Sequence, residues 1–211
     1  MKPVCVGLLL ALMAPASWGL NLWGVDVDGV EFQSSLLQIL DSVNDGAPDP
    51  VVNTIGISVP LRIVDRWYAR PELQLFFLGY KYAGDRAVPE SSEWDNVVEM
   101  SIMVNPIAGY DFPLTRDLVA SAEGGLGILL RFPVFLNGAT AADMALPATS
   151  WLLAGRFIYP NVGGALTWKI SPKISAVLRG QLYYPLFDLW SGVPLYDEVT
   201  YGVGIGIRYT F

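Results

Sequence analysis

The sequence contains no histidine and a single cysteine among its 211 residues. Without histidine, the chain has no general base for Ser-His-Asp or Cys-His catalysis, and it lacks the commonest zinc ligand. We therefore expect no enzyme, no cofactor and no metal site. The net charge of −7 argues against nucleic acid as a partner, because nucleic-acid-binding proteins present a basic surface.

Charged residues and long apolar runs are also scarce. Charged side chains make up 16% of the chain, whereas about 25% is usual for globular proteins. Beyond the N-terminal segment, the longest stretches without Asp, Glu, Lys or Arg are 12 residues. A membrane-spanning helix needs roughly 17–25 mostly apolar residues. The sequence thus excludes a protein built from several membrane-spanning helices, and its length suits one domain of roughly 200 residues.

The first 19 residues have the pattern of an export signal. Lys2 is the only charge, an apolar stretch runs from Val4 to Met13, and small residues follow up to Gly19. The alternative, a membrane anchor, is disfavoured because the apolar stretch is short and is followed by Pro15. We predict a signal peptide over residues 1–19 and a single mature domain over residues 20–211. The mature chain then has no cysteine, since Cys5 lies in the signal.

Apolar and polar residues alternate along most of the mature chain, which indicates strands with two different faces. The clearest case is 199–211, where the odd-numbered positions are apolar or aromatic and the even-numbered ones are small or polar. Eight such segments are expected, at about 21–31, 52–63, 69–82, 97–110, 118–132, 156–170, 173–184 and 199–211. Short connections near 64–67, 112–117 and 171–172 alternate with long ones through 33–51, 83–96, 133–155 and 185–198. This layout is typical of outer-membrane barrels, so we predict an all-β, eight-stranded, antiparallel up-and-down transmembrane β-barrel with both termini at the short-turn end.

Composition decides which face of the sheet points outward. A soluble barrel would expose the polar face to water, but such surfaces carry about 25–35% charged residues, and this face has about one charge per strand. The polar face is therefore predicted to fill a narrow lumen. The expected lumen network pairs five acids with five bases: Asp26, Asp28, Glu72, Glu99 and Glu123 with Arg62, Arg131, Lys169, Arg179 and Arg208. Asp26 and Asp28 are expected to pair with these bases rather than to bind a cation.

Aromatic residues near the strand ends are expected to form interfacial girdles. The candidates are Trp23, Trp67, Tyr68, Tyr110, Trp168, Tyr201, Tyr209 and Phe211.

The C-terminus supplies the sharpest motif. Phe211, preceded by Tyr209 and by apolar residues at alternate positions, resembles the assembly signal of bacterial outer-membrane barrels. Together with the export signal and the eight segments, the mature chain looks like small barrels of the OmpW, OmpX and OmpA-transmembrane type. The resemblance implies location in the outer membrane of a diderm bacterium as a multi-pass β-barrel. It also implies outer-membrane lipid and the barrel assembly machinery as partners, with Phe211 at the periplasmic end.

Two of the long connections are unusually apolar and suggest a binding site at the mouth of the barrel. The candidate ligand-binding residues are Phe135, Trp151, Tyr184, Phe187 and Trp190. With the OmpW-type resemblance, they predict a narrow porin-like channel or binder for small hydrophobic molecules. The alternatives are that these residues pack on each other, and that the protein is a non-conducting surface adhesin or structural protein. A short amphipathic helix is expected over Ser34–Val43.

Overall fold

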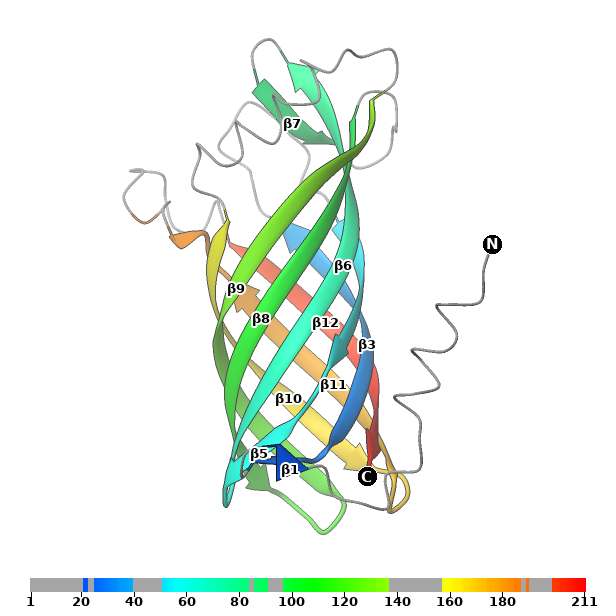
Figure 1. Cartoon of the computed structure of the whole chain (residues 1–211), viewed down its shortest axis with the longest axis vertical. Helices are drawn as coiled ribbons and strands as arrows, with labels where there is room; N and C mark the ends of the chain where they lie inside the picture. The colour runs from blue at the N-terminus through cyan, green and yellow to red at the C-terminus, as the bar shows by residue number, and fades with distance from the viewer. Residues whose placement is uncertain are drawn as a thin grey trace.

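The structure is a closed antiparallel β-barrel (Figure 1). The computed structural model describes residues 21–22, 25–39, 51–83, 86–90, 97–136, 157–186, 189 and 199–211. Eight long strands form the wall, and each pairs with two neighbours in the order β6-β4-β3-β12-β11-β10-β9-β8, with pairing between β8 and β6 closing the ring. The predicted fold class and strand number are therefore confirmed. The expected export signal, residues 1–19, lies outside the described residues.

The strand bounds follow the alternating segments closely. The wall strands are β3 (Gly29–Ile39), β4 (Val51–Ser58), β6 (Trp67–Ala83), β8 (Val97–Pro113), β9 (Leu118–Leu136), β10 (Ile158–Lys169), β11 (Ile174–Tyr183) and β12 (Thr200–Thr210). Four short strands are β1 (Asn21–Leu22), β2 (Val25–Val27), β5 (Leu61–Val64) and β7 (Arg86–Glu90). β2 and β5 pair with each other below β3 and β4, and β7 pairs with the upper end of β6. Among the described residues, no helix is long and apolar enough to cross a bilayer.

The first wall strand corrects the sequence-based expectation. The strand was expected to end near residue 31 and to be followed by a loop with a helix over Ser34–Val43. Instead β3 continues to Ile39 and pairs along its length with β4 and β12. Polar Ser34 on the outward face weakens the apolar alternation, so the local pattern alone did not reveal the strand. Residues 40–43 lie outside the described ranges.

A one-residue bulge changes the phase of alternation in the same region. Val27 pairs with Leu61 and Glu31 pairs with Ser58, so three residues intervene on one strand and two on the other. An extra residue of this kind locally disrupts the hydrogen-bond ladder between the strands and changes the face to which the following side chains point. Asp28, one of the three intervening residues, contacts Arg62, and from Glu31 onward the odd-numbered residues face the interior.

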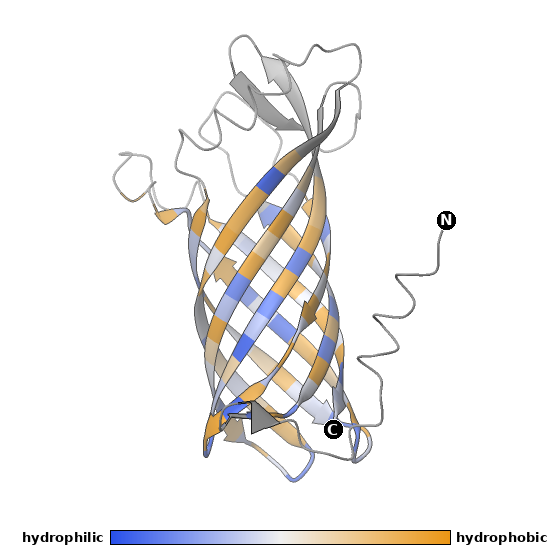
Figure 2. Ribbon diagram, in the orientation of Figure 1, coloured by the Kyte–Doolittle hydropathy of each residue, from blue (hydrophilic) through white to orange (hydrophobic). Residues whose placement is uncertain are grey.

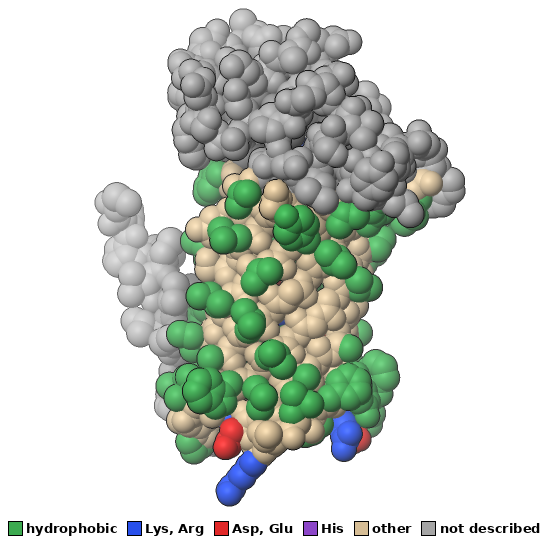
Figure 3. Space-filling view, turned by 180° about the vertical axis from the view of Figure 1, so that it is seen from behind, with side chains coloured by type: hydrophobic (Ala, Val, Ile, Leu, Met, Phe, Trp, Pro, Cys, Tyr) green, Lys and Arg blue, Asp and Glu red, His purple; other side chains and the backbone are tan. Residues whose placement is uncertain are grey.

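The two faces of the wall differ as the composition predicts. Apolar side chains cover the outside, and small or polar ones face the lumen, so colours alternate along each strand in Figure 2. On the face seen in Figure 3, the described charged side chains gather at the lower rim. In a closed sheet, every strand forms its backbone hydrogen bonds with its neighbours, and the apolar exterior presents hydrocarbon side chains to the lipid. A protein that spans a membrane needs both.

Aromatic rings encircle the lower end of this apolar surface. Trp67 and Tyr110 have ring centroids 5.1 Å apart, and Tyr110 and Phe112 have centroids 4.9 Å apart. Trp168 and Tyr209, near the C-terminal ends of β10 and β12, are also exposed. Tyr68, which was expected in this girdle, is buried inside the barrel instead, because even-numbered residues of β6 face the lumen. Trp23 lies outside the described residues.

Candidate functional site

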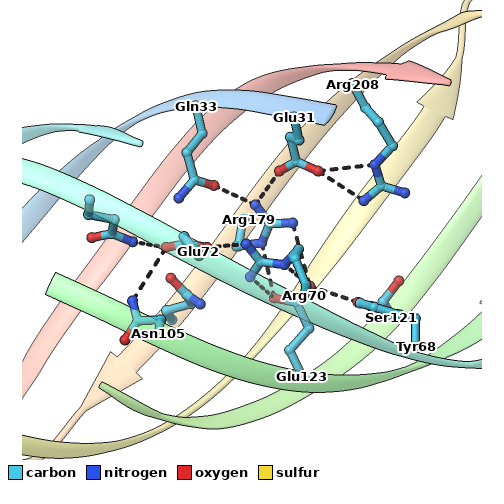
Figure 4. A network of polar contacts seen from close by, with 12 residues as sticks. Glu31, Gln33, Tyr68, Arg70, Glu72, Asn105, Ser121, Glu123, Arg179 and Arg208 are labelled. Carbon is cyan, nitrogen blue, oxygen red and sulfur yellow. Dashed lines mark hydrogen bonds and ion pairs between the residues drawn. The ribbon is translucent and has the colours of Figure 1, made fainter. Parts of the chain in front are cut away.

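Six charged side chains, five of them buried and Arg208 partly exposed, form a continuous chain across the lumen (Figure 4). Acid and base alternate in the order Arg208, Glu31, Arg179, Glu123, Arg70 and Glu72, and we call this set the ion-pair chain. Its members come from β12, β3, β11, β9 and β6, so it ties together strands from around the barrel. Three positive and three negative groups leave it neutral.

Glu123 is the centre of the ion-pair chain. Its Oε2 accepts hydrogen bonds from Arg70 Nη2 at 2.9 Å and from Arg179 Nε at 3.0 Å. The neighbouring acid, Glu31, is bound by Arg179 on one side and by Arg208 on the other, with 2.9 Å between Arg208 Nη2 and Glu31 Oε2. Each of the two inner acids therefore lies between two guanidinium groups, which compensates for its removal from water.

Tyr68 holds Glu123 from the short-turn side. Its hydroxyl donates to Glu123 Oε1 at 2.7 Å. The ring lies over Gly109 on β8, where a Cβ atom would come within 2.3 Å of Tyr68 Cζ. Only glycine therefore leaves room for the tyrosine ring against the wall, and this close approach fixes the direction of the hydroxyl.

Neutral side chains surround the other end of the ion-pair chain. Glu72 accepts hydrogen bonds from Arg70, from Gln74 Nε2 and from Asn105 Nδ2, the last at 3.4 Å. Gln74 also donates to the hydroxyl of Tyr183 at 3.3 Å. This amide and phenol layer continues the polar filling upward from the charges.

A second, smaller cluster lies at the lower end of the barrel. Arg62 Nη1 is 2.9 Å from Asp111 Oδ2, and Arg62 Nη2 is 3.0 Å from Asp28 Oδ2. Ser121 Oγ donates to Asp111 at 2.7 Å. The guanidinium carbon of Arg62 is 5.9 Å from the centroid of the Tyr68 ring, so Tyr68 separates the two clusters.

The structure brings together most, but not all, of the residues expected in the lumen network. Glu72, Glu123, Arg179 and Arg208 belong to the ion-pair chain, and Asp28 and Arg62 belong to the lower cluster. Asp26 and Lys169 are exposed at the lower end, where Asp26 pairs in register with Arg62 of the lower cluster. Arg131 is half-buried higher on β9. The side chain of Glu99 lies outside the described part of the chain.

Sequence reasoning missed three charged residues of these clusters. Arg70 shares the even-numbered phase of Glu72 on β6, and Asp111 shares the phase of Asn105 on β8, so extending the alternation by one step and by three steps would have found them. Glu31 was hidden by the bulge, because the phase that places Asp28 inward would place Glu31 outward.

The expected mouth residues fall mainly outside the described residues. Trp151, Phe187 and Trp190 are not described, and of Phe135 only the backbone is, in β9. Tyr184 is half-buried just after β11. Their role in ligand binding stays a prediction.

The expected assembly residues lie at the opposite end. Tyr209 is exposed, its ring centroid is 6.0 Å from that of Phe211, and Lys173 Nζ is 5.6 Å from the Tyr209 centroid. Their role in assembly also stays a prediction.

The arrangement fills space and pairs charges; it offers no free reactive group among the residues of the ion-pair chain. All three carboxylates are bound to arginine. Within the described ranges, no three His, Cys, Asp or Glu side chains cluster as metal ligands do. Side chains of this size occupy the interior of an eight-stranded barrel, which is just wide enough to hold them.

Comparison with known proteins identifies the fold. No protein-family model matches the sequence, and no curated protein matches it. Among solved structures, Neisserial surface protein A is 11% identical, with a TM-score of 0.56, over 89% of this chain and 99% of that chain. The attachment invasion locus protein Ail of Yersinia pestis is 8% identical, with a TM-score of 0.49, over 87% and 97%. The N-terminal β-barrel domain of Pseudomonas aeruginosa OprF is 11% identical, with a TM-score of 0.47, over 88% and 98%.

The similarity to Neisserial surface protein A shows a shared fold. A closed antiparallel wall, an apolar exterior, a ring of aromatic residues and a polar, side-chain-filled interior together define the class: this chain is a small eight-stranded outer-membrane β-barrel. It crosses the outer membrane several times, with short turns at one end and long connections at the other.

Proposed function

We propose that this barrel is non-conducting and that it acts through its extracellular end by binding. The single observation that carries the proposal is the ion-pair chain, which spans the lumen and is buried except for partial exposure of Arg208. The sequence predicted a porin-like channel as one possibility. Such a channel along the barrel axis would require the charged side chains of the ion-pair chain to separate. Separating a buried ion pair leaves uncompensated charge in a medium of low dielectric constant.

The remaining parts of the proposal concern assembly and partners. The export signal over residues 1–19 would deliver the chain, and the C-terminal segment ending at Phe211 would be recognised by the barrel assembly machinery. Outer-membrane lipid would contact the apolar exterior. Catalysis is not part of this proposal, since the acids of the ion-pair chain are each held by arginine.

Planar-bilayer recording tests the closed lumen directly. The refolded mature chain should give no unitary current steps above those of the bare bilayer, because ions cannot pass the ion-pair chain. A general porin reconstituted in the same bilayer serves as the positive control. Reproducible steps from the protein alone would contradict the proposal.

A second candidate function, binding of a small hydrophobic molecule, is favoured by the upper interior. Above the polar layer the described inward side chains include the apolar Leu37, Val52, Phe76, Met103 and Leu129. The polar Ser101 and Arg131 lie one inward position further up on β8 and β9. The five apolar side chains are buried beneath the end that carries the expected mouth residues. An apolar interior with a few polar groups beside it is the usual composition of a small-molecule site.

Two adjacent phenylalanines provide a matched test of this second candidate. Phe76 is buried in the lumen, whereas Phe77 faces outward on the same strand. Phe76→Ala should weaken binding of a fluorescent hydrophobic probe about tenfold, as expected for losing about 1.5 kcal/mol of apolar contact. Phe77→Ala should leave the affinity unchanged. If both variants bind the probe like the original protein, the upper interior is not the binding site.

A further inference from the structure

Among the described residues, the lipid-facing wall carries one polar strip. At the described outward positions of the wall strands, the side chains are apolar, glycine or aromatic, except for Ser34, Gln38 and Asn53. All three lie on the neighbouring strands β3 and β4. Ser34 Oγ donates to Asn53 Oδ1 at 3.1 Å, and the hydroxyl of Tyr201 donates to Gln38. We call Ser34, Gln38 and Asn53 the polar seam.

The seam reaches into the middle of the apolar band. Ser34 pairs in register with Ile205 on β12, and Ile205 lies midway between Tyr201 and Tyr209, the aromatic residues of the outward face of that strand. Polar groups at such a depth are costly unless they are satisfied by hydrogen bonds. The Ser34 bond uses the amide oxygen of Asn53, whose NH2 group has no partner among the described residues.

The surface around the seam has a pronounced shape. Ser34 lies between Ile55 of β4 and Ile205 of β12, its register partners. These two are the most exposed large hydrophobic side chains of the described residues, at 70% and 68%. A small polar residue thus forms the floor between two protruding isoleucines.

We propose that the polar seam is the contact face of a homodimer, in which two copies lie side by side in the membrane. Both copies must have the same orientation across the membrane, so a two-fold axis between them runs along the membrane normal and brings residues of equal depth together. The Asn53 NH2 group of each copy can then donate to the seam oxygens of the other. By the two-fold symmetry these hydrogen bonds form in both directions across the contact. The protruding isoleucines of one copy fit beside the small serine of the other.

The seam's chemistry favours a second copy over a different occupant. It is uncharged, so two identical surfaces do not repel each other. It offers both donors and acceptors, so it is complementary to itself. Lipid chains could fill the shape but would leave the amide N–H groups without acceptors.

Cysteine cross-linking in outer membranes tests this dimer. In a Cys5→Ala background an engineered cysteine is the only one in the chain. Leu36→Cys is suited because Leu36 pairs with Asn53 in register and leaves the seam intact. On mild oxidation it should give a disulfide-linked dimer in non-reducing gels. The matched control is Ile128→Cys on β9, across the barrel, which should stay monomeric.

A second variant tests whether the polar groups are responsible. Adding Ser34→Val and Asn53→Leu to Leu36→Cys should abolish the dimer, while the barrel stays folded by its resistance to protease. Equal cross-linking at residues 36 and 128, a monomer at residue 36, a disulfide to some other protein, or a dimer that persists without the polar groups would each overturn the proposal.

Discussion

Replacing Glu123 by glutamine is expected to lower the free energy of unfolding by about 3–5 kcal/mol, because it leaves the buried charges of Arg70 and Arg179 without their shared partner. The measurement is equilibrium unfolding in urea of the barrel reconstituted into lipid vesicles. The matched control is Asp117→Asn, a carboxylate exposed in the turn between β8 and β9, which should change the stability by less than about 0.5 kcal/mol.

The arrangement of the ion-pair chain allows a sharper version of this experiment. Removing Arg179 together with Glu123, as Glu123→Gln with Arg179→Gln, leaves two complete pairs: Glu31 with Arg208, and Arg70 with Glu72. The double variant should therefore lose clearly less stability than the sum of the two single variants, since contacting residues are non-additive. Strict additivity, or a loss below about 1 kcal/mol for Glu123→Gln, would mean that water compensates these charges and that the pairing is weak.

The second large effect is expected on the outside of the barrel. Val162 on β10 is 61% exposed and lies three outward positions above the girdle residue Trp168. Val162→Arg should destabilise the folded barrel in lipid by about 2–4 kcal/mol, because it places a charge near the middle of the hydrocarbon layer.

A matched control lies at the lower end of the same strand. Ile170 is 62% exposed just past the end of β10, so Ile170→Arg adds the same charge at the same exposure near the interface. It should cost only about 0–1 kcal/mol. Equal effects of the two substitutions would show that this face does not contact lipid as the fold requires.

Much of the fold could be predicted because the side chains of each strand indicate which of its faces is apolar and which is polar. Side chains alternate between the two faces of a strand, so the apolar odd positions from Val203 to Ile207 and the glycines between them indicate an outer and an inner surface without any knowledge of the neighbouring strands. The same signal gave the eight segments and their antiparallel order. It failed where it was locally weak, as in β3, where serine occupies an outward position.

The candidate site could be predicted only in part, because it depends on which strands meet and in which register. Alternation placed Glu72, Glu123 and Arg179 on the inner face but could not pair them. The Arg208–Glu31 bond joins residues 177 positions apart, and the bulge beside Asp28 decides that Glu31 faces inward. A shift of one residue in either strand would send that carboxylate to the lipid.

The amino-acid sequence by itself determined that there are eight amphipathic strands and that the outward face of each is almost entirely apolar. It also determined that charged residues are few enough to be enclosed in a barrel lumen. Those features are local, and the pleat of a strand is sufficient to express them. Only the tertiary structure decided that six charges from five strands form a neutral alternating chain, and that the polar residues of the described exterior gather on β3 and β4. The ion-pair chain depends on the stagger of strands around the barrel, which arises from all the pairings together.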